Sequence, residues 1–265
     1  MYYYKSSKDN SQVIDKLSML AEAHPKRGCD KLYSMIRGEG IKWNYKRVRR
    51  VYCMMKLNIR RKVKKRLPAR LKQSLEVPAA INKTWSMDFM SDALISGRKI
   101  RILNIMDDFN REVLAIEANT SIPSVAVIRT LENLLDWRGK PEQIRVDNGP
   151  EFTSTILADW CKEQDIKLQF IQPGKPNQNG YIERFNRTYR DEILNSYLFE
   201  DMDQVRVLSW DWMEEYNTKR PHESLGEMTP QKYKELSLLV DSGKLEKSFP
   251  QSTRSNSDHN RNILI

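Results

Sequence analysis

Cysteine and histidine are scarce in this chain of 265 residues, with three of each. They are Cys29, Cys53, Cys161, His24, His222 and His259. No Cys-x-x-Cys or His-x-x-x-His pair occurs, and structural zinc sites are usually built from such closely spaced pairs. A free cysteine is most often a small buried side chain. We therefore expect neither disulfides nor a structural zinc ion.

The chain also lacks a long apolar segment. No stretch approaches the roughly 18 consecutive apolar residues that a membrane-spanning helix needs. Residues 1–8 have neither the apolar stretch nor the cleavage site of a signal peptide. Apolar residues still make up 39% of the chain, enough for a sizeable core and a smaller module. We expect a cytoplasmic protein of two domains with no membrane contact.

Acidic residues are nearly absent from one segment. Between Lys26 and Lys72 there are 18 lysines and arginines against two acids, a net charge of +16. The rest of the chain has 27 basic and 33 acidic residues, a net charge of −6. A basic segment on a mildly acidic body is typical of a polyanion-binding module attached to a part that holds cations. The asymmetry predicts nucleic acid as the partner.

Apolar spacing predicts three helices near the N-terminus. The first covers residues 11–24 and ends before Pro25, the second is capped by Asp30, and the third begins at Asn44. The outer faces of the third helix carry the basic residues Lys46, Arg47, Arg49 and Arg50. Two short helices joined by a glycine-containing turn, the second rich in arginine, indicate a helix-turn-helix over residues 24–66. An ordinary helical hairpin with a solvated basic face has the same pattern.

A basic run follows these helices. It consists of Arg60, Arg61, Lys62, Lys64, Lys65 and Arg66. Such a run is too charged to pack into a core, and the polar stretch after it contains Pro68 and Pro78. We interpret residues 67–80 as a basic, proline-containing linker able to follow a phosphate backbone.

From Lys83 onward the apolar period changes to that of a strand. Trp85, Met87 and Phe89 alternate with polar residues, so that Asp88 lies on the polar side. Strands at 99–106 and 112–118 complete a three-stranded meander.

Helices and strands then alternate along the chain. We expect a helix at 124–137 with Ile128, Leu131 and Leu135 inward, a strand at 143–146, a helix at 155–164, a strand at 166–171 and a long helix from Tyr181. Trp210, Trp212 and Tyr216 indicate a further packed helix. The whole is an α/β fold with a mixed sheet covered by helices.

Three acids stand where local structure explains them poorly: Asp88 in the first strand, Asp147 just after the fourth, and Glu183 in the first turns of a helix. Neighbouring strands are about 5 Å apart, so Asp88 and Asp147 can share an ion if their strands are adjacent. Two Mg²⁺ ions about 4 Å apart, held by such acids, can act on a phosphodiester.

Each acid also has an ordinary interpretation. Asp147 resembles a turn residue before Asn-Gly, and Glu183 resembles half of a surface Glu–Arg pair. Asp92, Asp107 and Asp108 compete as ligands. We interpret Asp107 as a structural turn acid and Asp92 as exposed.

Four motifs carry a resemblance to a known family. They are Trp85-Ser-Met-Asp-Phe, Val146-Asp-Asn-Gly-Pro-Glu-Phe, Pro173-Gly-Lys-Pro-Asn-Gln-Asn-Gly-Tyr-Ile-Glu-Arg-Phe-Asn-Arg and Tyr216-Asn-Thr-Lys-Arg-Pro-His. In this order they resemble the integrase-type core of bacterial insertion-sequence transposases, the OrfB product, whose catalytic core is like that of retroviral integrases. Residues 24–66 are similar to the helix-turn-helix that precedes that core. The resemblance implies a ribonuclease H-like fold and a DDE triad with 35 residues between the second Asp and the Glu.

The resemblance also implies a site and a reaction. Asp88, Asp147 and Glu183 would bind two Mg²⁺ or Mn²⁺ ions and catalyse nicking at the element's ends, then attack of the freed 3′-hydroxyl on target DNA. Asn148 and Gly149 would shape the turn presenting Asp147. Candidate DNA contacts near the cleaved end are Gln178, Asn179, Arg184, Asn186, Arg187 and Arg190. The implied partners are the element's ends, target DNA, further copies of the chain, and an upstream OrfA-type partner or fusion. DNA binding would associate the protein with the nucleoid.

These features divide the chain into five parts: a helical N-terminal region at 1–66, a linker at 67–80, a catalytic core at 81–200, a helical extension at 201–240 and a polar, disordered tail at 241–265. Two other functions fit the sequence. One is a noncatalytic DNA-binding regulator derived from such an element, and the other is a stand-alone ribonuclease H-like nuclease.

Overall fold

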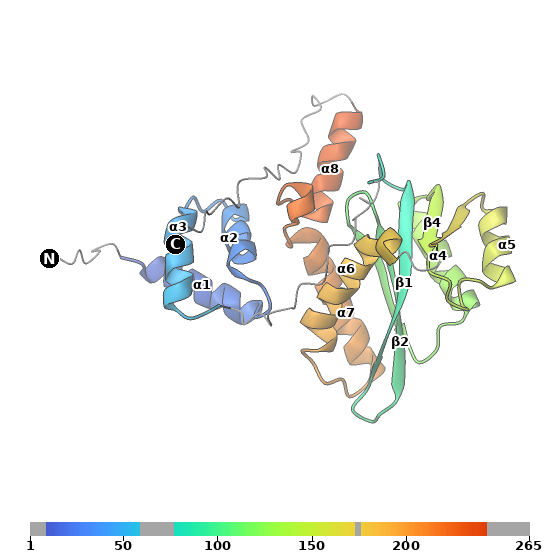
Figure 1. The fold of residues 1–265 in the computed structure, drawn as a ribbon, viewed down its shortest axis with the longest axis horizontal. Helices are drawn as coiled ribbons and strands as arrows, with labels where there is room; N and C mark the ends of the chain where they lie inside the picture. The colour runs from blue at the N-terminus through green and yellow to red at the C-terminus, as the bar shows by residue number, and fades with distance from the viewer. Residues whose placement is uncertain (1–8, 59–76, 173–175, 243–265) are drawn as a thin grey trace, which may run out of the picture.

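The computed structural model describes residues 9–58, 77–172 and 176–242. The basic run at 60–66, most of the expected linker and the expected tail beyond 242 lie outside these residues. Figure 1 shows four successive layers from left to right: the N-terminal helices, a second group of helices, a twisted sheet, and two more helices on its far side.

The N-terminal module consists of three short helices: α1 (Ser11–Ala23), α2 (Cys29–Gly38) and α3 (Tyr45–Met54). They share one small apolar core. Asn44 caps α3 as predicted, because its side chain accepts from the backbone N–H of Lys46 at 2.8 Å. The prediction for Asp30 was wrong. Gly28 occupies the N-cap of α2, and the Asp30 carboxylate instead accepts from the Tyr45 hydroxyl at 2.5 Å, joining α2 to α3.

Five strands form the predicted mixed sheet. They are β1 (Thr84–Ala93), β2 (Lys99–Asp107), β3 (Val113–Asn119), β4 (Gln143–Val146) and β5 (Lys167–Phe170). Their order is β3-β2-β1-β4-β5, with β1 to β3 antiparallel, β4 parallel to β1, and β5 parallel to β4.

One face of the sheet is covered by α4 (Ser124–Arg138) and α5 (Thr155–Glu163), and Trp85 and Met87 of β1 are fully buried beneath them. The predicted inward face of α4 was partly wrong. Val127, Leu131 and Leu134 are the buried residues, whereas Ile128 and Leu135 lie at the edge and are only partly buried. Positions i, i+4 and i+7 counted from Val127 face the sheet, so the helix is rotated relative to the orientation that was predicted.

The other face is covered by α6 (Gly180–Tyr189), the π turn η2 (Arg190–Leu194) and α7 (Met202–Thr218). The 3-10 turn η1 (Pro176–Asn179) precedes α6, and the 3-10 turn η3 (Glu223–Leu225) and α8 (Pro230–Asp241) follow α7, with α8 packed against α7. The predicted stripe of Ile182, Phe185, Tyr189 and Ile193 is buried in this second core. None of the helices described is long and apolar enough to cross a membrane.

Two tryptophans of α7 differ sharply in burial. Trp212 is 7% exposed and donates its indole N–H to Glu192, as predicted for a packed residue. Trp210 is 65% exposed, so its predicted packing was wrong. Two positions along a helix turn a side chain by about 200°, so both residues cannot face one core.

The contrast predicts unequal effects on stability. Trp212→Ala should lower the free energy of unfolding by about 3–5 kcal/mol, because it leaves a large cavity. Trp210→Ala should change it by less than about 0.5 kcal/mol, as expected of a surface substitution. Denaturant unfolding followed by circular dichroism measures both. Equal losses for the two variants would contradict the burial described here.

Candidate active site: three carboxylates between β1, β4 and α6

The pairing of β1 with β4 brings two predicted acids into one row. The strands are parallel, and Ser86 lies opposite Arg145. Two residues further along each chain are Asp88 and Asp147. Because neighbouring strands are about 4.8 Å apart, these acids lie side by side at the end of the shared ladder. The adjacency on which a shared ion depends is therefore present.

Asp88 is held by a chain of two buried amides. Its Oδ2 accepts from Asn186 Nδ2 of α6 at 2.7 Å, and its Oδ1 accepts from the backbone N–H of Phe89 at 2.8 Å. Asn186 Oδ1 in turn accepts from Asn104 Nδ2 at 2.7 Å. Asn104 is fully buried and is the β2 residue directly opposite Asp88. The carboxylate is thus oriented by both the neighbouring strand and the covering helix.

Asp147 is oriented by the turn that follows it. The backbone N–H of Gly149 donates to Asp147 Oδ1 at 2.9 Å. A Cβ atom at Gly149 would lie 3.0 Å from that oxygen, so glycine is the residue that leaves the carboxylate in place. Asn148 donates from Nδ2 to the carbonyl of Ile171 just beyond β5. The turn-shaping role of Asn148 and Gly149 stays a prediction.

The loop after Asp147 is fastened to the sheet through residues that sequence reasoning missed. Arg101 of β2 pairs with Glu151 at 2.6 Å, and its guanidinium lies 4.5 Å from the centre of the Phe89 ring. Phe89 also stacks on Phe152, with ring centres 4.9 Å apart. The only sequence signal was the Glu-Phe pair ending the second motif. Its partner on β2 could not be identified without the strand register.

Glu183 approaches from the covering helix. It lies in the first turn of α6, exposed, and three residues before Asn186, so the two share one side of the helix. None of Asp88, Asp147 and Glu183 has an ion-pair partner among the residues described. Such carboxylates are suited to a divalent cation.

Electrostatics couple the three acids. The pKa of Asp88 is raised to about 6, chiefly by burial and further by the charges of Asp147 and Glu183, against the hydrogen bonds from Phe89 and Asn186. Within the described ranges, however, no group of three or more His, Cys, Asp and Glu side chains is close enough to hold one metal ion. Asp147 and Glu183 thus act electrostatically on Asp88, but the three acids do not surround a single ion.

The competing acids have partners within the protein. Asp107 accepts from the backbone N–H groups of Asn82 and Phe109, which confirms it as a turn acid. Asp108 is buried and accepts from Ser86 and Arg145. Asp92 was predicted to be exposed, which was wrong. Its side chain is 26% exposed and lies 3.6 Å from Arg190.

The predicted DNA contacts on α6 and its entry loop fall into two groups. Arg184 and Arg187 are exposed. The others already have protein partners or are buried: Gln178 accepts from the backbone N–H of Gln172, Arg190 donates to the carbonyl of Ser91, and Asn179 and Asn186 are buried. Asn186 donates a hydrogen bond to Asp88.

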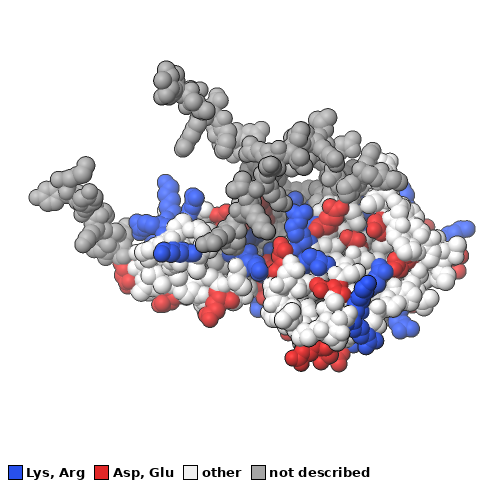
Figure 2. Space-filling view, turned by 60° about the horizontal axis from the view of Figure 1, so that its bottom comes forward, with Lys and Arg blue, Asp and Glu red and all other residues white. Residues whose placement is uncertain are grey.

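The basic residues of α3 are mostly free of the core. Lys46, Arg49 and Arg50 are exposed, while Arg47 is half-buried and bonds to the side chain of Asn10 and the carbonyl of Asp9. Figure 2 shows lysine and arginine gathered on one side of the N-terminal module, at the left, with acidic residues on its opposite side. On the visible face of the core the two signs are mixed.

The amide chain predicts a measurable pKa change. Asn186→Ala removes a hydrogen bond that favours the ionised carboxylate, so the pKa of Asp88 should rise above its value of about 6. Carboxyl-carbon NMR titration of metal-free protein measures it. Asn148→Ala, whose side chain contacts Ile171 and not Asp88, is the control. An unchanged or lowered pKa in Asn186→Ala would refute the orienting role.

Comparison with known proteins places the chain in a family. Two family models, both described as integrase core domain, match residues 78–176 and 164–230. The chain is 36% identical over 232 residues to the insertion element IS407 uncharacterized 31.7 kDa protein of Burkholderia multivorans, covering 88% of this chain and 84% of that protein. It is 38% identical over 218 residues to the insertion element IS476 uncharacterized 39.2 kDa protein of Xanthomonas euvesicatoria, covering 82% of this chain and 63% of that protein.

A solved structure supports the fold. The simian T-cell lymphotropic virus intasome, in complex with PP2A regulatory subunit B56 gamma, contains a chain similar to this one with a TM-score of 0.51. The likeness covers 84% of this chain and 74% of that chain at 16% identity. The five-stranded mixed sheet flanked by helices is ribonuclease H-like, as predicted. With both integrase-core matches and relatives from insertion elements over most of its length, the chain belongs to the insertion-sequence transposases that have an integrase-type core.

Proposed function

We propose that this protein is a DNA transposase that nicks DNA at its element's ends and joins the freed 3′-hydroxyl to target DNA in a metal-dependent reaction. One observation carries the proposal: Asp88 lies beside Asp147 on paired strands and its pKa is raised by burial and by the charges of Asp147 and Glu183, while none of the three acids has a cationic partner among the described side chains. Burial and like charge both disfavour ionised Asp88, so a bound cation would stabilise its charged form.

The donor set suits Mg²⁺ or Mn²⁺. All three side chains offer only oxygen ligands, which these ions prefer. We propose that Asp88 and Asp147 share one ion and that Glu183 contributes to a second. When bound, such ions neutralise charge on the phosphodiester and activate the attacking water or hydroxyl.

The protein's own contribution is to hold the acids in place. Asn186, which is buried, and Gly149, which is half-buried, each donate one hydrogen bond that fixes the carboxylate of Asp88 and of Asp147, respectively. Catalytic groups need positions accurate to a fraction of an ångström, and such supporting contacts supply that accuracy. Glu183, exposed on α6, remains able to adjust when substrate arrives.

DNA would reach these acids along basic side chains. We propose that Arg184 and Arg187 contact phosphates beside the carboxylates, and that Lys46, Arg49 and Arg50 of α3 contact DNA further away. Phosphate contacts position the duplex without reading its sequence. Further copies of the chain and an upstream OrfA-type partner would assemble on the same DNA.

Removing one carboxylate tests the proposal. Asp147→Asn and Glu183→Gln should each lower Mg²⁺-dependent nicking and strand transfer by at least about a hundredfold, the scale seen when a charge-stabilising group is lost. DNA retention should be nearly unchanged, because the basic residues remain. The assay uses labelled DNA carrying the element's terminal repeats.

The matched control is Asp165→Asn, which neutralises an acid whose side chain is 98% exposed and lies away from the site on the turn after α5. It should keep full activity. Full activity in either carboxylate variant would overturn the proposal and favour a noncatalytic regulator. Nicking without joining of precut 3′-hydroxyl ends would instead indicate a stand-alone nuclease.

A further inference from the structure

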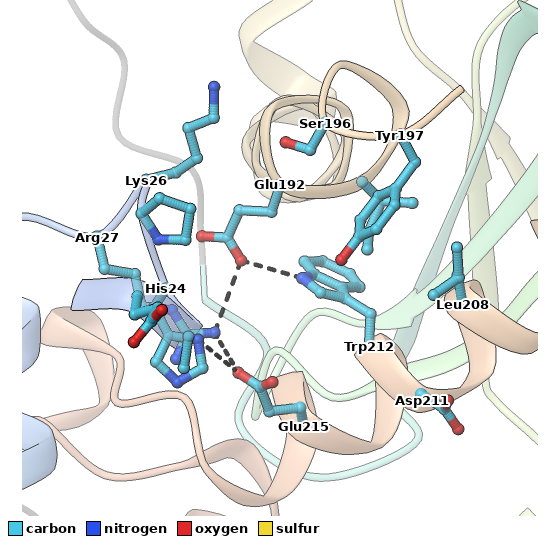
Figure 3. A pocket seen from close by; sticks show the side chains of 14 residues that line it. His24, Lys26, Arg27, Glu192, Ser196, Tyr197, Leu208, Asp211, Trp212 and Glu215 are labelled. Atoms are coloured by element: carbon cyan, nitrogen blue, oxygen red, sulfur yellow. Dashed lines mark hydrogen bonds and ion pairs between the residues drawn. The ribbon is translucent and has the colours of Figure 1, made fainter. Parts of the chain in front are cut away.

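The N-terminal module and the core meet along a polar seam. Figure 1 shows α1 and α2 beside the layer formed by α6 to α8. A cavity of about 380 Å³ remains within this seam, lined by side chains from both parts. Figure 3 shows an arginine and a histidine of the segment leading into α2 in contact with glutamates of the core. The seam therefore contains charge pairs beside its apolar side chains.

That arginine is Arg27, which is only 4% exposed. Its Nη2 lies 2.5 Å from Glu215 Oε1 of α7 and 3.6 Å from Glu192 Oε2 of η2 (Figure 3). Its Nη1 donates to the sulfur of Met35 in α2. The guanidinium is thus held by its own module on one side and by the core on the other.

Glu192, the partner of Arg27 on η2, is held in place by other residues of the core. Glu192 lies in the π turn η2, an irregularity often found at functional positions. It also accepts two hydrogen bonds from Arg220 Nη1, at 2.7 and 2.8 Å, and one from the indole of Trp212. Although burial acts to raise the pKa of Glu192, the neighbouring Arg220 and Arg27 lower it, so this carboxylate stays ionised.

The fourth sequence motif supplies the rest of the contact. The carbonyl of Pro221 accepts from Lys31 Nζ at 2.5 Å, and Glu227 just beyond η3 accepts from the Ser34 hydroxyl at 2.7 Å. His222 is half-buried and packs edge-on against Tyr216, with ring centres 4.9 Å apart. The motif thus has a structural task that the proposed chemistry does not use.

We propose that Glu192, Glu215 and residues 220–227 form a docking socket for α2, which holds the N-terminal module at one place on the core. Breaking a buried charge pair is costly, whereas an exposed pair contributes little, so the buried Arg27 pair favours a specific interface. Because the socket engages α2, the basic residues Lys46, Arg49 and Arg50 of α3 stay exposed for DNA.

The functional part of this inference rests on the proposed transposase activity. A module docked at one place holds bound DNA at a fixed offset from the three carboxylates. The socket is then a positioning element, because it acts on the reaction through DNA placement and touches no reacting atom. Weakening the contact between the socket and the N-terminal module should therefore broaden the distribution of cleavage positions along the DNA.

Distances between spin labels test the docking directly. One label sits on native Cys53, which is exposed on α3, and the other on Ile95→Cys in the exposed β1–β2 turn, in a Cys29→Ser background. Cys161 is buried and should not react. The parent protein should give one narrow distance distribution, unchanged when labelled chains are diluted with unlabelled ones.

Substitutions on both sides of the seam should open it. Arg27→Met and Glu215→Ala should each lower the docked-to-undocked ratio by about 30-fold or more and broaden the distribution, as expected when one partner of a buried charge pair is removed. The matched controls are Lys26→Met and Glu214→Ala, exposed neighbours that change the same charges. Because Glu215→Ala lies on the core, it separates undocking from any damage to the module.

The outcomes are distinct. A broad distribution in the parent protein, or a narrow one in both Arg27→Met and Glu215→Ala, would overturn the socket. A distribution that changes on dilution would place the module on another copy and overturn docking within one chain. These distances do not depend on catalysis. If the parent nicks DNA, unchanged cut positions in an undocked variant would overturn the positioning role alone.

Discussion

The parallel pairing of β1 with β4 is the constraint on which the site depends. It places Asp88 and Asp147 in one row, although 58 residues separate them along the chain. The strand β4 has only four residues, and they are enough to hold this pairing because both faces of the sheet are covered, by α4 and α5 on one side and by α6 and α7 on the other. Covering the second face with α6 also brings Glu183 and Asn186 to the same place.

The position of Asp88 lowers the stability of the fold, as residues of functional sites often do. Burial and two like charges raise the pKa of Asp88, which lies in a covered strand, to about 6. Such a carboxyl group does not stabilise the fold, and it does not ionise readily. Asn104 and Asn186 offset part of that cost by bonding in series to the carboxylate. Asp107 and Asp108 are also fully buried, and burial raises the pKa of both, that of Asp107 to about 6, although each accepts hydrogen bonds within the protein.

The sequence predicted the elements well because each has a local cause. Alternation placed Trp85 and Met87 in one core, and the i, i+3 and i+7 spacing from Ile182 placed the α6 stripe in the other. Long-range partners were not predictable in this way. The Asn186–Asp88 bond, the Arg101–Glu151 pair and the Arg27 contacts join positions whose proximity follows only from register and helix placement. Trp210 is exposed although it is aromatic, because its position around the helix turns it away from the core that buries Trp212.

Metal-induced stabilisation tests the central claim, that the three acids together bind divalent cations. At neutral pH, Mg²⁺ should raise the melting temperature of the protein, because a ligand that binds only the folded state stabilises it. The rise should be lost in Asp88→Asn, Asp147→Asn and Glu183→Gln, and kept in Asp165→Asn. An equal rise in all four variants, or none in the parent protein, would contradict the account.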